Sequence, residues 1–142
     1  MMKKWPLFLC FVMFISGCAT CASGPLFAPA SPSPDKKSVL YVYRNIGSLG
    51  VAPTVKINGK PFVVLTSGGY SYAYLSPGIY KLTFQWMGGL GYTFTTQIEI
   101  KPGEDLFEKH YSTSVIMEDI PADQGLEDIK QYRYVPTLNS DF

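Results

Sequence analysis

The residue with the clearest chemical role in the sequence is Cys18. It directly follows two small residues, Ser16 and Gly17. Residues 5–15 before them form an uncharged apolar run, which itself follows two lysines. A positive start and a short apolar run are typical of an export signal. A membrane-spanning helix needs roughly 20 apolar residues, so this run is too short to span a bilayer. Because small residues let an extended chain approach a peptidase closely, the pattern predicts cleavage just before Cys18.

Residues 14–19 (FISGCA) resemble the lipobox of bacterial lipoproteins. The resemblance implies that residues 1–17 are removed as a signal peptide, that Cys18 carries a diacylglycerol thioether, and that the new amino terminus is usually acylated. Several acyl chains hold a protein on a bilayer firmly, because each buried methylene contributes about 0.8 kcal/mol. Lipoproteins of the inner membrane commonly have an aspartate where this chain has Ala19. We therefore expect a lipid anchor in the cell envelope, in the outer membrane facing the periplasm if the host is Gram-negative.

Two other fates of the N-terminus stay open. An ordinary signal peptidase that cuts nearby, for instance after Ala22, would release a secreted domain, and an uncleaved signal would itself be the anchor. Cys21 is either an additional thiol or a second acylation site. With Cys18 modified and Cys10 removed, the mature chain has no pair of thiols for an internal disulfide. The domain is therefore expected to depend on its hydrophobic core.

The other candidates for chemistry do not indicate catalysis. His110 is the single histidine and no Gly-x-Ser-x-Gly elbow accompanies it, so we expect a solvent-exposed strand residue instead of a catalytic triad. The acidic pairs 104–105 and 118–119 have the residue types that cleave glycosidic bonds, but adjacent acids at loop ends are usually only solvated. The stretch 88–91 lacks the following helix of a phosphate-binding loop. We predict no enzyme activity, no metal site and no cofactor.

The candidate binding surface consists of Tyr70, Tyr72 and Tyr74, which alternate along one predicted strand and so share one face. Either this face is core, with the phenols at its rim, or it is an exposed aromatic platform that stacks on sugars or anchors a protein partner. Arg44 ends the first predicted strand. It is a candidate for bidentate binding of an anion, or it pairs with a neighbouring acid.

The charge balance of the chain excludes one class of partner. The sequence has 12 Lys and Arg against 11 Asp and Glu, and removing the two lysines of the signal leaves 10 against 11. Nucleic-acid binding needs concentrated positive charge, so we predict no nucleic-acid partner. Aromatic residues make up 15% of the chain, a composition that favours strands.

Residues 18–37 are predicted to be a tether between the lipid and the domain. Four prolines lie there among Ala and Ser, without the apolar periodicity of a packed element. At about 3.1 Å per residue when extended, such a stalk would lift the domain on the order of 50 Å from the bilayer. The folded domain is then expected over residues 38–142.

The domain is predicted to be all-β, with short strands separated by turns. Expected strands cover residues 38–44, 54–57, 61–66, 70–75, 80–86, 92–101 and 106–111. Asn58-Gly59 is typical of a tight hairpin. In residues 80–86 and 92–101, apolar and polar residues alternate, so one face should be buried and the other solvated.

Three further expectations complete the predicted architecture. The strand 106–111 is expected at a sheet edge, where Glu108 and Lys109 would deter stray pairing. Residues 122–131 are expected to form a short helix with Asp123 as a possible cap, followed by a docked or frayed tail. The fold class predicted is a small antiparallel β-sandwich, Ig-like or transthyretin-like, with a short C-terminal helix.

Four short motifs occur in a recognisable order: residues 39–44 (VLYVYR), 57–60 (INGK), 65–70 (LTSGGY) and 75–78 (LSPG). Behind a lipobox, this order resembles the bacterial lipoprotein family catalogued as domain of unknown function 2846. The resemblance covers about residues 38–111. It implies a small β-sandwich on a lipid anchor and brings no known activity. We therefore expect a non-enzymatic interaction or structural module; the alternative is a lipoprotein that binds glycan or peptidoglycan through aromatic side chains.

Overall fold

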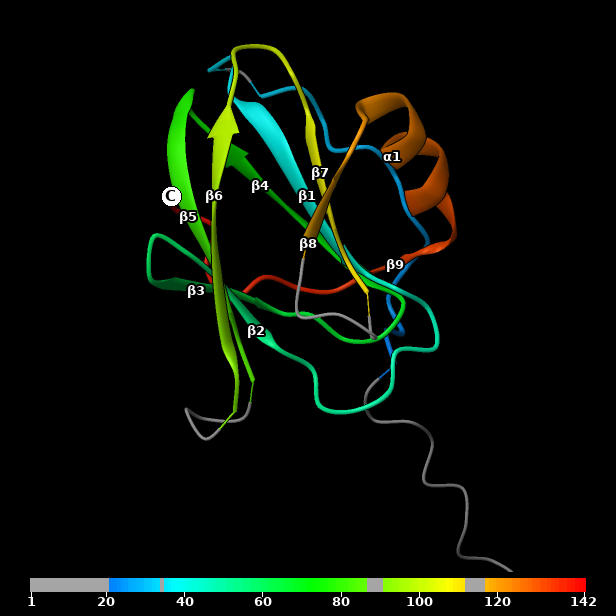
Figure 1. The fold of residues 1–142 in the computed structure, drawn as a ribbon. Helices are drawn as coiled ribbons and strands as arrows, with labels where there is room; N and C mark the ends of the chain where they lie inside the picture. Colours follow the sequence, from blue (N-terminus) through cyan, green and yellow to red (C-terminus); the bar gives the residue numbers. More distant parts are fainter. Residues whose placement is uncertain (1–20, 34, 87–90, 112–116) are drawn as a thin grey trace, which may run out of the picture.

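The computed structural model describes residues 21–33, 35–86, 91–111 and 117–142. Within them the chain forms two β-sheets packed face to face, with one short helix near the C-terminus (Figure 1). This confirms the predicted all-β sandwich. Cys18 and the predicted signal peptide, residues 1–17, lie outside the described residues.

The strands of each sheet come from distant parts of the chain. Among the described residues, one sheet has the order β8-β7-β1-β4-β9 and the other the order β3-β2-β5-β6. Most neighbours are antiparallel, while β1 with β7 and β4 with β9 are parallel. The elements are β1 (Ser38–Arg44), β2 (Thr54–Ile57), β3 (Lys60–Val64), β4 (Gly69–Leu75), β5 (Gly78–Gln85), β6 (Thr93–Ile100), β7 (Leu106–His110), β8 (Met117–Ile120), α1 (Ala122–Asp128), the 3-10 turn η2 (Ile129–Gln131) and β9 (Arg133–Tyr134).

The predicted strands are all present, and β2 and β3 show why their turn was predictable. Asn58 and Gly59 both adopt positive φ, of 48° and 81°, as a tight hairpin turn requires. In β5 and β6 the alternation also holds, because Leu82, Phe84 and Ile98 are buried whereas their neighbours along the strands are partly or fully exposed. The period of two therefore identified the buried face correctly.

Two hydrophobic clusters stabilise the domain, one on each face of the five-stranded sheet. The inner cluster lies between the sheets and comprises Leu40, Val42, Val55, Ile57, Phe62, Val63, Leu65, Ala73, Leu75, Leu82, Phe84, Ile98, Ile100 and Met117. The outer cluster lies on the opposite face and comprises Val39, Tyr41, Tyr43, Tyr70, Phe107, Ile129 and Tyr132. Because β1 contributes alternate residues to both clusters, all of its residues are buried.

The prediction that residues 106–111 form an edge strand is wrong. β7 lies between β1 and β8, and both Glu108 and Lys109 are buried. The edge is instead β8, which the sequence pattern did not indicate. Lys109 is accommodated by the outer cluster, where its ammonium contacts the Asp128 carboxylate at 2.5 Å and lies 5.7 Å from the centre of the Tyr43 ring.

The predicted helix is present as α1 followed by η2, and it covers the outer face of the sheet beside β7 (Figure 1). Gly125 allows this close approach, because a Cβ there would lie 2.4 Å from Cγ of Phe107. The predicted cap at Asp123 is wrong: Pro121 is the N-cap and no side chain caps the helix, while Asp123 lies in the first turn.

The C-terminal tail is docked on the four-stranded sheet. The backbone N–H of Leu138 donates to the carbonyl of Phe62 at 2.7 Å, and the rings of Phe142 and Phe62 meet edge to face at 5.6 Å. In the part of the chain that the structure describes, no helix combines the length and the hydrophobicity needed to cross a bilayer.

Candidate functional site

The three tyrosines of β4 lie on the outer face of the five-stranded sheet, away from the inner cluster. Ala73 and Leu75, which alternate with them, point between the sheets. Tyr70 is buried, and Tyr72 and Tyr74 are half-buried. The tyrosines do share one face as predicted, and that face is covered by other parts of the chain.

The cover is residues 21–33, here called the covering segment. It runs along the outer face from one end of the sheet to the other (Figure 1). Its backbone bonds to β9 and the residue before it: the Phe27 N–H donates to the Tyr132 carbonyl at 2.9 Å, and the Tyr134 N–H donates to the Pro25 carbonyl at 2.8 Å. The described part of the predicted tether therefore packs on the domain instead of extending away from it as a stalk.

Tyrosine hydroxyls hold the covering segment through its backbone. The Ala30 N–H donates to the Tyr41 hydroxyl at 2.9 Å and the Ala28 N–H to the Tyr70 hydroxyl at 3.3 Å, while the Tyr74 hydroxyl donates to the Ser31 carbonyl at 2.6 Å. These bonds occupy backbone groups that an irregular segment would otherwise leave unpaired. Phe27 adds edge-to-face contacts at 5.7 Å to Tyr41 and 5.1 Å to Tyr70. The tyrosine face is thus a docking surface for the chain's own N-terminal residues.

Arg44 is buried at the end of β1 and does not present its guanidinium to an external anion. One terminal nitrogen donates to the Leu49 carbonyl at 3.1 Å and the other to the Leu65 carbonyl at 3.4 Å. Its Nε has no hydrogen-bond partner among the described residues. Arg44 therefore fixes the loop that follows β1 to the end of β3.

The prediction that His110 is a solvent-exposed strand residue is wrong. It is buried opposite Arg44, with its ring 6.0 Å from that of Phe84 and 5.4 Å from that of Trp86. Burial, and secondly the charge of Arg44, lower its pKa to about 4. Neither ring nitrogen bonds to a described residue, so no carboxylate there orients it as in a triad.

An acidic cleft opens where β6 faces β7 and β8, between the edges of the two sheets. Its volume is about 780 Å³. Carboxylates dominate its charged lining: Glu99, Glu104, Asp105, Glu108 and Asp119, against the single cation Lys101. The apolar side chains of Ile98, Leu106, Met117 and Leu126 complete the walls. Both acidic pairs singled out in the sequence thus contribute to one site.

Glu108 is the unusual member of this cleft. The residue is 4% exposed, and its side chain makes no hydrogen bond or ion pair with any described residue. Burial, and secondly the charge of Asp119 opposite it on β8, raise its pKa to about 7. A carboxyl group that is half ionised near neutrality can accept a cation or donate a hydrogen bond, and strongly perturbed groups in clefts often mark functional sites. Among the described residues, no cluster of three or more His, Cys, Asp and Glu is arranged to hold a metal ion.

Sequence reasoning missed Glu108 because it placed β7 at a solvated edge. One signal was available: Leu106, Glu108 and His110 alternate, so an inward position for Leu106 brings the other two inward as well. No family model matches the chain, and no curated protein matches it. The resemblance to the domain of unknown function 2846 family stays a prediction.

Proposed function

We propose that this chain is a lipid-anchored cell-envelope protein whose β-sandwich acts as a non-enzymatic binding module. Its anchor is the diacylglycerol thioether on Cys18, in the outer membrane facing the periplasm if the host is Gram-negative. The support for the anchor is the sequence of residues 1–19. Because residues 21–33 pack on the sheet, only residues 18–20 would separate the proposed lipid from the folded domain.

The acidic cleft is the proposed contact site of this module, and Glu108 is the observation that carries it. Glu108 is almost wholly removed from water, no described residue bonds its carboxyl group, and it lines the cleft; because a carboxylate with little water and no partner is unfavourable, a ligand in the cleft would gain by supplying the missing contact. The lining acids favour a positively charged group, and the apolar walls favour hydrophobic neighbours beside it. A Lys or Arg side chain of an envelope protein, with aliphatic residues next to it, has this chemistry.

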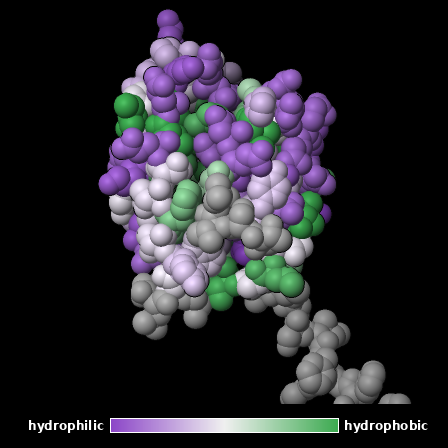
Figure 2. All heavy atoms as spheres, in the orientation of Figure 1, coloured by the Kyte–Doolittle hydropathy of each residue, from purple (hydrophilic) through white to green (hydrophobic). Residues whose placement is uncertain are grey.

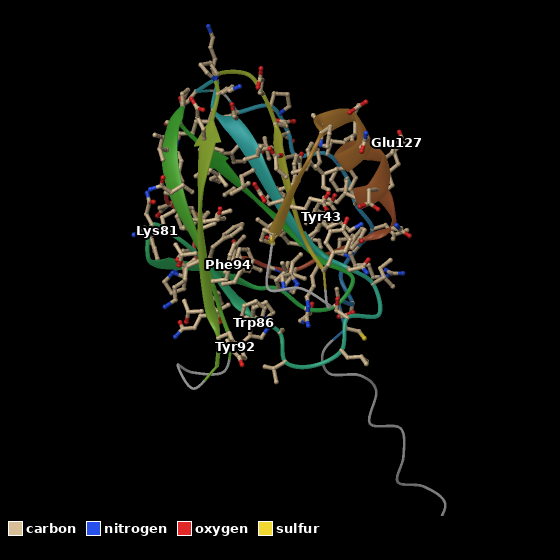
Figure 3. The ribbon with its side chains drawn as sticks, viewed as in Figure 1. Tyr43, Lys81, Trp86, Tyr92, Phe94 and Glu127 are labelled. Carbon is tan, nitrogen blue, oxygen red and sulfur yellow. The ribbon has the colours of Figure 1, made fainter. Side chains whose placement is uncertain are left out.

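Site-directed crosslinking in intact cells tests this proposal. Benzoylphenylalanine at position 126, on the cleft wall, should crosslink one partner, whereas the same probe at position 81, on the far side of the four-stranded sheet (Figure 3), should not. Adding Glu108→Gln to the variant with the probe at position 126 should weaken the crosslink severalfold, because a neutral amide attracts a cation less than a carboxylate does. Equal crosslinking with Gln at position 108 would contradict a role for the carboxyl group.

The lipid is tested separately with labelled palmitate. The wild-type chain should incorporate label and fractionate with membranes, while Cys18→Ser should do neither. Label on the Cys18→Ser chain would show that the anchor lies elsewhere.

A glycan is the second candidate ligand, because carboxylates also accept hydrogen bonds from sugar hydroxyls and half-exposed Tyr72 lies on the outer face. Soluble domain retained on purified cell wall, and released by Glu108→Gln or by Tyr72→Ser, would favour this candidate over a protein partner. The two variants distinguish the cleft from the tyrosine face.

A further inference from the structure

The covering segment begins at one end of the sandwich. The backbone of Cys21 pairs with that of Ser67, just before β4, in an isolated parallel β-bridge. The Ala22 N–H donates to the Ser67 carbonyl at 3.0 Å. Cys18 is three residues earlier, and three residues reach at most about 10 Å when fully extended. If Cys18 is lipidated, as in the proposed function on which this inference rests, this end of the domain must lie close to the bilayer.

The same end carries a loop with three exposed aliphatic side chains. In the connection between β1 and β2, Leu49 is 88% exposed, Ile46 51% and Val51 47%. The loop, residues 45–53, contains no charged residue. Scattered single apolar residues are normal on a surface, whereas a cluster of them in an uncharged loop marks a contact site.

The loop and the start of the covering segment are joined through one short stretch, residues 67–68. The Gly68 N–H donates to the Arg44 carbonyl at 3.0 Å, and a Cβ on Gly68 would lie 3.5 Å from Cγ1 of Ile46. Ser67 is the residue that pairs with Cys21. The exposed aliphatic side chains are thus next to the point where the lipid-bearing chain leaves the domain.

The loop is held in a defined shape that displays Leu49. The buried Arg44 guanidinium donates to the Leu49 carbonyl at 3.1 Å, and the Ser48 hydroxyl donates to the Asn45 carbonyl at 2.7 Å. Gly47 and Gly50 on either side adopt positive φ of 76° and 87°, which glycine adopts without strain. The side chain of Leu49 therefore points away from a fixed backbone instead of folding back onto the core.

Aromatic side chains lie at this end as well. Figure 3 shows Trp86 and Tyr92 at the lower end of the molecule, where the connection from β1 to β2 also lies in Figure 1, and Tyr92 is exposed. Figure 2 shows hydrophobic residues on the same lower end. Trp and Tyr are favoured at the boundary between lipid headgroups and acyl chains.

We propose that the β1–β2 loop, through Ile46, Leu49 and Val51, contacts the bilayer that holds the Cys18 lipid. The anchor brings this end within about 10 Å of the membrane, and contact removes the aliphatic side chains from water. The domain then stands on the membrane with this end down, and the opposite end, where Ile79 lies at the start of β5, points away from it.

An environment-sensitive fluorophore on a single cysteine tests the proposal with the lipidated full chain. In a Cys21→Ser background, Leu49→Cys carries the probe, and Ile79→Cys, also well exposed at 70%, is the matched control at the opposite end. In vesicles of phosphatidylethanolamine and phosphatidylglycerol, the probe at position 49 should brighten severalfold, shift to the blue and be quenched by lipids brominated in their acyl chains. The probe at position 79 should show none of these changes.

The outcomes separate the two proposals. Protein that does not float with the vesicles would refute the lipid anchor. Protein that floats while the probe at position 49 behaves like the probe at position 79 would overturn membrane contact alone. A blue shift of the probe at position 49 that occurs in intact envelopes but not in vesicles containing only lipid and the labelled protein would also overturn membrane contact. The loop would then face a protein partner.

Discussion

The two hydrophobic clusters on either face of the five-stranded sheet are built differently, although β1 contributes to both. The inner cluster is mostly aliphatic and is enclosed by strands of both sheets. The outer cluster is rich in tyrosine and is enclosed by the covering segment, α1, η2 and β9. Leu40 and Tyr41 are adjacent in sequence and belong to opposite clusters. The inner cluster therefore depends on strand pairing, and the outer one on the two ends of the domain.

This difference has an energetic consequence. Aliphatic side chains stabilise by leaving water and packing tightly, whereas the tyrosines also bond to the backbone of an irregular segment. We therefore expect that local opening of that segment would expose part of the outer cluster while the sandwich stays folded. We expect inner substitutions to change global stability and outer ones to change mainly the docking of residues 21–33.

The largest expected effect is in the inner cluster. Leu40→Ala removes a fully buried side chain between the sheets and should lower the free energy of unfolding by about 2 to 5 kcal/mol, because a cavity remains. Urea unfolding followed by tryptophan fluorescence measures this. A loss below about 1 kcal/mol would mean that the two sheets repack around the site.

The next effect comes from two ionisable groups on the inner face of β7, and it appears as a pH dependence. The pKa of Glu108 is raised from 4.5 to about 7, so the folded state binds more protons than the unfolded state between these values, and stability falls as pH rises. The pKa of His110 is lowered from 6.5 to about 4, so the folded state binds fewer protons and stability rises with pH there. The two slopes oppose each other between about pH 4.5 and 6.5.

Glu108→Gln separates these slopes. At pH 8 the variant should be more stable than the wild type by about 2 to 3 kcal/mol, because no carboxylate must be kept ionised inside the fold. The stability of the variant should rise from pH 4 to 6.5, because only the pH dependence due to His110 remains, and it should then stay level. Urea midpoints measured from pH 4 to 8 test this, and a variant that is less stable than the wild type at pH 8 would refute the buried, unpaired state of Glu108.

A smaller effect is expected where the covering segment inserts its one aromatic side chain. Phe27→Ala removes the edge-to-face contacts with Tyr41 and Tyr70 and should weaken docking by about 1 to 2 kcal/mol. Hydrogen exchange at the Ala28 and Ala30 amides should accelerate about tenfold or more. The amides of β1 should keep their protection, and Leu26→Ala, at an exposed position, should leave all of these rates unchanged. Faster exchange in β1 would mean that both clusters open together.

The inner cluster could be predicted from the sequence and the outer one could not, for a physical reason. Alternation in β5 and β6, and the Asn58-Gly59 turn, are local signals that fix which side chains face the other sheet. The outer cluster joins β1 and β4 to residues 21–33 and 129–134, and no local pattern specifies such distant contacts. The segment rich in proline has the composition of a linker, and it docks because tyrosines far along the chain bond its backbone.

The same limit applies to the candidate site. The predicted lipobox is a contiguous motif, so its recognition needs no knowledge of the fold. The acidic cleft is assembled from β6, β7, β8 and α1. The spacing of its carboxylates along the sequence therefore does not indicate that they share one site. Glu108 and His110 are buried where β7 pairs with β1 in parallel. Parallel strands are not joined by a hairpin turn, so no turn motif in the sequence predicts this pairing.

The smallest predicted effect tests a single hydrogen bond between the outer cluster and the covering segment. Tyr41→Phe keeps the ring, including its stacking on Phe107 at 4.8 Å, and removes the hydroxyl that accepts from the Ala30 N–H. The loss should be about 0.5 to 1.5 kcal/mol of docking, because water then replaces one protein hydrogen bond. Exchange of the Ala30 amide should accelerate while the urea midpoint shifts little. Tyr72→Phe is the matched control, since no described residue bonds its hydroxyl, and it should change neither quantity. If Tyr41→Phe instead lowers the midpoint as much as Leu40→Ala, the outer cluster is part of the cooperative core and the distinction between the two faces fails.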